Sequence, residues 1–240
     1  MTRWSLLLIS DLHYDAQQIR DPQRFDLNRI ASVANLEVVV SAGDLTDHGW
    51  GKSLCFRKQD DEFTPFIENF VNPLEKMGLR ILLCGGNHDT YVKFPYIHKP
   101  VLQYIKEKYN STYYHFDHNK SNCYKREIHG ITFISMGVYP KNLKWLSENL
   151  PNDKSSPVII FFHYNFLDDE AHSGWWKEIE KQEFYNVIKD HNISGIMHGH
   201  IHTTSVKKWN GIPVFNGSSP NTPLLIKFED DKIVDTDTLN

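Results

Sequence analysis

Six short apolar runs recur along the chain, and they constrain its fold more than any other feature. The runs are WSLLLIS (4–10), LEVVVSA (36–42), LRILLC (79–84), ITFISM (131–136), PVIIFF (157–162) and ISGIM (193–197). They are rich in leucine and β-branched residues and do not alternate with polar residues. This composition is typical of strands that are buried on both faces of a sheet.

Segments with helical spacing lie between these runs. Residues 61–77 place apolar side chains on one face at a 3.6-residue repeat, and Pro73 is expected to bend or end this helix. Further helices are expected over 96–109, 141–150 and 181–191. Strands that alternate with helices predict an α/β layered fold. The last part differs, because 206–219 and 224–239 resemble short strands joined by turns and predict an antiparallel finish to the sheet.

Length and composition fit a single α/β domain over residues 1–240. The chain has 240 residues, of which 40% are hydrophobic and 23% are charged, and no repeat or long linker divides it. The net charge of −4 provides no basic field for membranes or long nucleic acids. The first apolar run is too short for a spanning helix or a signal peptide, and three widely spaced cysteines do not indicate disulfides. We therefore expect a cytoplasmic protein without a membrane or a long nucleic acid as partner.

Polar residues of the kinds that bind metals directly follow five of the six runs. They are Asp11 and His13; Asp44 and Asp47; Asn87 and His88; His163; and His198, His200 and His202. Because sites in open α/β sheets form at the carboxyl ends of the strands, the five loops are expected to meet there. The closely spaced histidines of residues 198–202 then form one wall of a shared site.

Seven of these side chains are candidate metal ligands, which is more than a single catalytic ion requires. They are Asp11, His13, Asp44, Asn87, His163, His200 and His202. Aspartate, histidine and asparagine side chains suit divalent first-row metals. Two ions about 3.5–4 Å apart could share one carboxylate, and Asp44, which is central in the series, is the expected bridge. Such a pair activates water and neutralises the oxygens of a phosphoryl group.

Five motifs in a fixed order resemble those of the calcineurin-like metallophosphoesterase superfamily. They are DLH (11–13), GDLTD (43–47), GNHD (86–89), the histidine at 163 and GHIH (199–202). The resemblance spans most of the chain and implies a four-layer α/β/β/α sandwich with mixed sheets and two metal ions, often manganese, iron or zinc. The compact spacing is most similar to the small single-domain branch that includes cyclic-nucleotide phosphodiesterases.

The resemblance also implies a role for each matching residue. One metal takes Asp11, His13, Asp44 and His202, and the other takes Asp44, Asn87, His163 and His200. His88 matches the family's non-ligand histidine, which contacts the phosphate and is proposed to protonate the leaving oxygen. Asp47 matches the carboxylate that can orient this histidine.

Some residues near the motifs have structural interpretations instead. A lone histidine after an apolar strand, such as His163, is usually structural, and only its place in the series favours metal binding. Asp89 is expected to be a loop or cap residue, and His198 to point into the sheet or lie behind the ligands. Cys84, inside an apolar run, is expected to be a buried small hydrophobe. His48 is expected on the surface or in a loop.

The complete ligand series favours a metal-dependent hydrolase of phosphate esters, most of all a phosphodiesterase acting on a small nucleotide-like substrate. A phosphomonoesterase or a protein phosphatase of the same superfamily stays an alternative. Protein phosphatases usually carry arginine where this chain has His48. A nuclease is less favoured, because it needs a basic track for long DNA or RNA, which this chain lacks. A non-catalytic interaction module is also less favoured, because it would not need all the ligands together with His88.

The segment 164–180 follows the candidate ligand His163 and contains Trp175 and Trp176. Exposed aromatic rings beside a phosphate site can stack on a base with about 1–3 kcal/mol each. Asn87, His88 and the two tryptophans are therefore candidate substrate-binding residues. The alternative is that both tryptophans only anchor the loop to the body of the protein. Three acidic residues in the same segment (168–170) disfavour long polyanions in either case.

Overall fold

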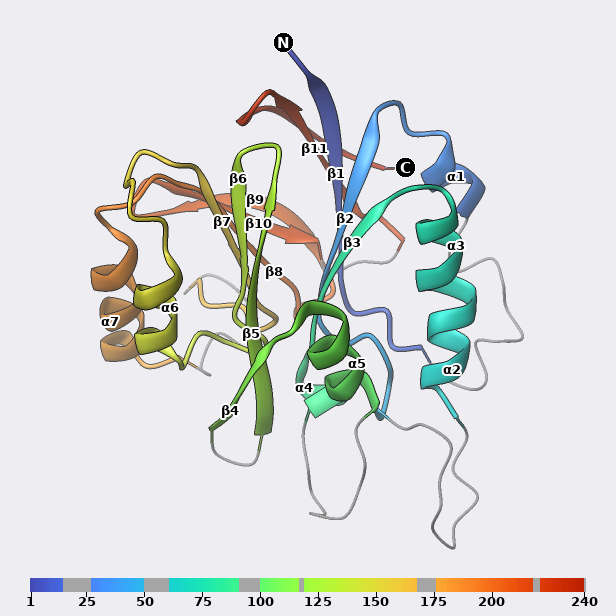
Figure 1. Ribbon diagram of the computed structural model, residues 1–240, viewed down its shortest axis with the longest axis horizontal. Helices are drawn as coiled ribbons and strands as arrows, with labels where there is room; N and C mark the ends of the chain where they lie inside the picture. The colour runs from blue at the N-terminus through green and yellow to red at the C-terminus, as the bar shows by residue number, and fades with distance from the viewer. Residues whose placement is uncertain are drawn as a thin grey trace, which may run out of the picture.

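The computed structural model describes residues 1–14, 27–49, 61–90, 100–116, 119–167, 176–217 and 221–239. Two sheets face each other, and helices cover their outer faces (Figure 1). The first sheet has the order β12 (Lys232–Thr238), β11 (Leu224–Glu229), β1 (Arg3–Ile9), β2 (Leu36–Ala42) and β3 (Arg80–Cys84). The second has the order β4 (Thr112–Phe116), β5 (Asn119–Ile128), β6 (Ile131–Ser135), β7 (Val158–Phe161), β8 (Ile193–His198), β10 (Ile212–Gly217) and β9 (Thr204–Trp209).

All six apolar runs form strands, as predicted. β1, β2 and β3 are parallel, and so are β6, β7, β8 and β10. Their side chains alternate between two cores: Phe161 of β7 packs between the sheets, whereas Ile160 packs beneath the outer helices. Burial of both faces explains why these strands are apolar without interruption, and it confirms the four-layer α/β/β/α arrangement with mixed sheets.

The helices of the described residues are α1 (Leu27–Ala31), α2 (Phe63–Phe66), α3 (Asn72–Lys76), α4 (Asn87–Thr90), α5 (Pro100–Tyr109), α6 (Leu143–Asn149) and α7 (Glu178–Ile188). Helices α1, α2 and α3 lie on the outer side of the first sheet and α6 and α7 on that of the second, whereas α4 and α5 lie near β3 and β5, where the two sheets meet (Figure 1). A π-helical turn, η3 (Ile67–Val71), joins α2 to α3. Pro73 therefore does not end the predicted helix. It lies in the first turn of α3, directly after the π turn, where the missing N–H of proline interrupts the regular bonding pattern.

The two C-terminal hairpins join different sheets, which corrects the prediction of one antiparallel finish. The β9–β10 hairpin extends the second sheet through the parallel pair β8–β10, and the β11–β12 hairpin extends the first sheet beside β1. The core between the sheets takes side chains from both, among them Leu6 and Val38 from the first and Phe133 and Phe215 from the second. One domain over residues 1–240 stays our prediction. Within the described ranges, no helix is long and apolar enough to cross a membrane.

Candidate metal centre

The candidate ligands meet where strands of both sheets end. Asp11 and His13 follow β1, Asp44 follows β2, and Asn87 begins α4 just after β3. The second sheet contributes His163 after β7, and His200 and His202 after β8. Backbone hydrogen bonds tie neighbouring loops together: the N–H of residue 13 donates to the carbonyl of residue 44 (2.9 Å), and that of residue 199 to the carbonyl of residue 163 (3.0 Å).

Five of the seven candidate ligands have a left-handed backbone. The φ angles are 54° at Asp11, 43° at His13, 49° at Asp44, 79° at His200 and 51° at His202. Such a conformation is uncommon for residues with a side chain and costs about 1–3 kcal/mol at each position. The rest of the fold compensates for the cost of this backbone conformation. At the ends of the strands, the left-handed conformation turns the ligand side chains toward one another.

Glycines let the ligand loops approach each other closely. A Cβ added at Gly86 would lie 2.1 Å from Oδ1 of Asp44 and 2.2 Å from its backbone nitrogen. A Cβ at Gly199 would lie 2.0 Å from Oγ of Ser10 and 2.8 Å from Oδ2 of Asp11. A side chain at either position would displace an aspartate, which explains the glycine in GNHD and in GHIH.

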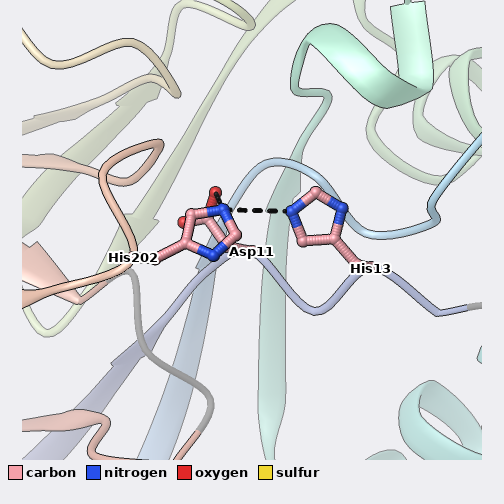
Figure 2. A group of neighbouring side chains, drawn as sticks. All are labelled: Asp11, His13 and His202. Atoms are coloured by element: carbon pink, nitrogen blue, oxygen red, sulfur yellow. Dashed lines mark hydrogen bonds and ion pairs between the residues drawn. The ribbon is translucent and has the colours of Figure 1, made fainter. Parts of the chain in front are cut away.

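A first group contains Asp11, His13 and His202 (Figure 2). Asp44 lies beside this group and contacts it through His13. The Nε2 atoms of His13 and His202 face each other at 3.3 Å. Nε2 of His202 lies 3.6 Å from Oδ1 of Asp11, and Nε2 of His13 lies 3.7 Å from Oδ2 of Asp44. The imidazole of His202 is largely exposed, so this group lies at the open side of the site.

A second group contains Asp44, His163 and His200, with Asn87 beside it. Nε2 of His163 is at its centre, 3.2 Å from Oδ2 of Asp44, 3.0 Å from Oδ1 of Asn87 and 3.3 Å from Nδ1 of His200. The side chain of His163 is fully buried. Its Nδ1 donates to the carbonyl of Ala42 (2.8 Å), which leaves the lone pair of Nε2 directed at the group.

Asp44 lies between the two groups, and its two carboxylate oxygens have different partners. Oδ1 accepts the backbone N–H of His88 at 2.9 Å. Oδ2 faces both His163 and His13. The structure therefore places a single oxygen of Asp44 where it can contact both groups, in agreement with the bridging role predicted from the sequence.

The donor atoms fit a pair of metal ions. Ligands bound at 2.0–2.2 Å lie about 3.0–3.5 Å from one another in octahedral or tetrahedral geometry. The separations within the two groups run from 3.0 to 3.7 Å, with nitrogen and oxygen donors mixed in both. Either group needs only small shifts to close around an ion.

Burial and mutual proximity change the acidity of these residues. Burial raises the pKa of Asp11 to about 7. Burial would also raise the pKa of Asp44, but the neighbouring imidazole of His163 holds it below its usual value. For His163 burial favours the neutral ring, yet the Asp44 carboxylate raises its pKa to about 9. Without metal, the centre therefore retains protons at neutral pH.

We expect metal uptake at pH 7 to release about one proton from His163, because an imidazole must be neutral at Nε2 to bind a metal. The apparent affinity for metal should rise about tenfold per pH unit between pH 7 and 9, more steeply below pH 7, where Asp11 also carries a proton, and level off above pH 9. Calorimetric titrations with Mn²⁺ in buffers of different ionisation enthalpy measure the released protons. A binding enthalpy that does not depend on the buffer would contradict this expectation.

His88 and Asp47 lie at the edge of the first group. The imidazole of His88 is partly exposed, and its Nδ1 donates to the backbone carbonyl of Asp47. Oδ1 of Asp47 lies 3.5 Å from Nδ1 of His88 and 3.3 Å from Nδ1 of His13. Asp47 therefore lies beside the candidate acid His88 and holds it through its backbone carbonyl, while the orienting role of its carboxylate stays a prediction. The carboxylate also contacts a candidate ligand, His13, which the sequence did not predict.

Asp89 lies in α4 and holds the GDLTD and GNHD motifs together. Its buried carboxylate accepts the backbone N–H groups of Leu45 (3.0 Å), Thr46 (3.0 Å) and Gly86 (2.9 Å), and the hydroxyl of Thr46 (2.9 Å). His198 is also fully buried, and burial lowers its pKa to about 4. A further contact was not predicted: the buried carboxylate of Glu62 binds His48, which directly follows Asp47.

The structure corrects the prediction that Trp176 stacks on a substrate. Its side chain is 4% exposed and belongs to the core beneath α6 and α7. The ring centroid lies 5.5 Å from that of Tyr139, 5.6 Å from Phe162, 5.4 Å from Phe166 and 5.6 Å from Phe184. The anchoring alternative is therefore right for Trp176. Trp175 and the acidic residues 168–170 lie outside the described residues.

Trp176→Ala should lower the free energy of unfolding by about 3–5 kcal/mol, because it leaves a large cavity among aromatic rings. Urea unfolding followed by circular dichroism measures this change, and Trp176→Phe provides a control that keeps most of the packing. Nucleotide and base-free substrates should be affected alike. Wild-type stability combined with a selective loss of nucleotide hydrolysis would instead restore the stacking role.

The fold and the site together define a two-sheet α/β protein built around a potential dinuclear centre. A sequence profile of the calcineurin-like phosphoesterases matches residues 5–204. The chain belongs to this family, whose members depend on two metal ions and hydrolyse phosphate esters. A probable cyclic nucleotide phosphodiesterase from Psychrobacter sp. (strain PRwf-1) is 34% identical over 86 residues. The matched stretch is only 34% of this chain and 24% of that relative.

Solved structures confirm the fold. A dimetal phosphatase from Danio rerio superposes with a TM-score of 0.65 at 12% identity, over 99% of this chain and 98% of the other. GAP50, the anchor in the inner membrane complex of Plasmodium, has a TM-score of 0.62 at 12% identity, over 99% of this chain and 84% of the other. At such low identity the likeness establishes the architecture alone.

Proposed function

We propose that this protein is a phosphodiesterase for small nucleotide-like substrates that uses two metal ions, of manganese, iron or zinc. The observation that carries the proposal is the position of Oδ2 of Asp44, which faces His13 in one group and His163 in the other. Two complete sets of donors share this oxygen. A protein that had kept the fold only for interaction would not need both sets.

Seven side chains hold the ions in this proposal. The first takes Asp11, His13, Asp44 and His202, and the second takes Asp44, Asn87, His163 and His200. Two bound ions supply Lewis acidity and a nucleophile at neutral pH. The protein contributes fixed geometry, because the carbonyl of Ala42 and the backbone N–H of His88 hold His163 and Asp44 in place.

His88 is the proposed general acid. Its Nδ1 hydrogen is fixed on the carbonyl of Asp47, so Nε2 is the atom available to hand a proton to a leaving oxygen. The backbone N–H of the same residue binds Asp44. This link sets the distance between the acid and the metal centre, which a proton transfer to the leaving group requires. Asn87 and His88 are also the proposed contacts for the phosphate.

Two observations favour a small diester over other phosphate esters. The stretch of similarity to a probable cyclic nucleotide phosphodiesterase points to this substrate class. In place of the arginine of protein phosphatases the chain has His48, whose Nδ1 is engaged by the carboxylates of Glu62 and Asp47. The net charge of −4 offers no attraction for long nucleic acids.

A metal analysis combined with a substrate panel tests the proposal. The purified protein should bind two ions and, with Mn²⁺, hydrolyse cyclic nucleotides and aryl phosphodiesters faster than nucleotide monoesters. A phosphoprotein and long DNA should be poor substrates. Preference for monoesters or for a phosphoprotein would mean that the protein is a phosphomonoesterase or a protein phosphatase instead of a phosphodiesterase. A metal-loaded protein without any esterase activity would favour an interaction module.

A further inference from the structure

The carboxylate of Asp47 is shared among three histidines. Oδ1 lies 3.3 Å from Nδ1 of His13, and Oδ2 lies 3.1 Å from Nδ1 of His48. His88 is further from the carboxylate, at 3.5 Å, and its Nδ1 already has the backbone carbonyl of Asp47 as acceptor. The side chain of Asp47 therefore contacts His13, a candidate ligand of the first ion, more closely than the candidate acid.

A buried glutamate fixes the other end of this arrangement. Oε2 of Glu62 accepts the backbone N–H of His48 at 2.7 Å, and Oε1 lies 2.8 Å from Nδ1 of the same residue. The side chain of Glu62 is 5% exposed. Carboxylates only accept, so Nδ1 of His48 carries a hydrogen that points at both Glu62 and Asp47. The proton on Nδ1 holds the two carboxylates together, as a cation would.

The orientation of Glu62 is not explained by helix capping. Glu62 occupies the N-cap position of α2, where a carboxylate commonly binds the first free N–H groups. It makes no such bond, and Asp61 accepts the N–H of Thr64 at 3.0 Å instead. The carboxylate of Glu62 is thus available for His48, and the helix start keeps its own acceptor.

We propose that Glu62 and His48 are positioning residues that lock Asp47 against His13 and thereby set the affinity of the first group for its metal ion. The chain of contacts runs from Glu62 to Nδ1 of His48, to Oδ2 of Asp47, and from Oδ1 of Asp47 to Nδ1 of His13. A carboxylate on the outer nitrogen of a ligating histidine fixes its tautomer and increases its basicity. The inference rests on the metal centre proposed above, but not on the identity of the substrate.

Two substitutions separate positioning from simple folding. Glu62→Gln keeps the shape but leaves a single acceptor for the two donors of His48, the backbone N–H and Nδ1–H, so the two contacts that hold the ring beside Asp47 cannot both be kept. His48→Leu removes that hydrogen, but it also leaves Oε1 of the buried Glu62 without its imidazole partner, so its stability is measured together with its metal affinity. His48→Asn is the rescuing variant, because its amide nitrogen replaces Nδ1 and has a hydrogen for each carboxylate.

The test is calorimetric titration of Mn²⁺ into the metal-free full-length protein. Glu62→Gln and His48→Leu should each weaken one of the two sites by about tenfold or more, and their double variant should be no weaker than either alone. His48→Asn and the neighbouring control Asp61→Asn should bind as the wild type does. The melting temperature of each metal-free variant is measured as well, because a purely structural role would lower it without selectively weakening one of the two metal sites.

Wild-type affinity at both sites in Glu62→Gln and His48→Leu would overturn the inference, and so would equal losses in Asp61→Asn. If Glu62→Gln does not fold, His48→Leu together with His48→Asn decides. The outcome is distinct from a failure of the proposed function. If only the proposed function is wrong, the wild-type protein will bind two ions but hydrolyse no phosphodiester. The variants will still show the predicted loss of metal affinity.

Discussion

Replacing Asp44 with asparagine should lower the metal content and reduce turnover by more than about a hundredfold. Loss of a residue behind a metal ligand typically costs 10–100-fold, and a shared ligand should cost more. The structure shows why the change is selective. The asparagine oxygen can still accept the N–H of His88, while its amide group would face His13 and His163, where it cannot bind a metal.

Metal analysis and steady-state kinetics on an aryl phosphodiester measure this loss. Asp153→Asn makes the same chemical change at an exposed loop, where Asp153 accepts only from Ser155 and Ser156, and should behave as wild type. Two ions retained at full occupancy in Asp44→Asn, with unchanged activity, would rule out the bridge.

The sequence predicted the parts of the fold that depend on burial. The parallel strands are apolar without interruption because both faces are covered, so their positions could be read directly. β5 was missed since it has no apolar run: Ser121 and Asn122 are buried although they are polar, whereas Lys125 and Glu127 are exposed. The same pattern is compatible with a loop or a helix surface. The division of the two hairpins between the sheets depends on strand order, which local sequence does not encode.

The candidate ligands were predictable because each one directly follows a recognisable strand. The contact between His48 and Glu62 was not, since it joins residues 14 positions apart in the sequence, and no motif links them. The left-handed backbone at His13, His200 and His202 was not predictable either, because glycine and asparagine are its usual markers. Trp176 shows a further limit of prediction from sequence. A tryptophan in the segment that follows a candidate ligand looks the same in the sequence whether its ring faces the core or the substrate.

His88→Ala should retain both metal ions and lose about 10²–10⁴-fold in rate on alkyl phosphodiesters. Its backbone N–H, which binds Asp44, is kept in the variant, so the metal centre should remain intact. An alkoxide leaving group needs a proton as it departs, and a nitrophenolate hardly does. The loss on aryl esters should therefore be much smaller, and the ratio of the two rates identifies the missing acid.

The measurement compares kcat for an alkyl and an aryl diester at saturating Mn²⁺, together with metal content. His88→Asn is a matched variant, because its side chain can still bind the carbonyl of Asp47 but cannot transfer a proton. It should show the same selective loss as His88→Ala. If both variants instead lost metal, or lost rate equally on the two esters, His88 would be a positioning residue of the metal centre. Removing a general acid must slow the ester with the poorer leaving group more, so an equal loss would mean that His88 does not transfer the proton.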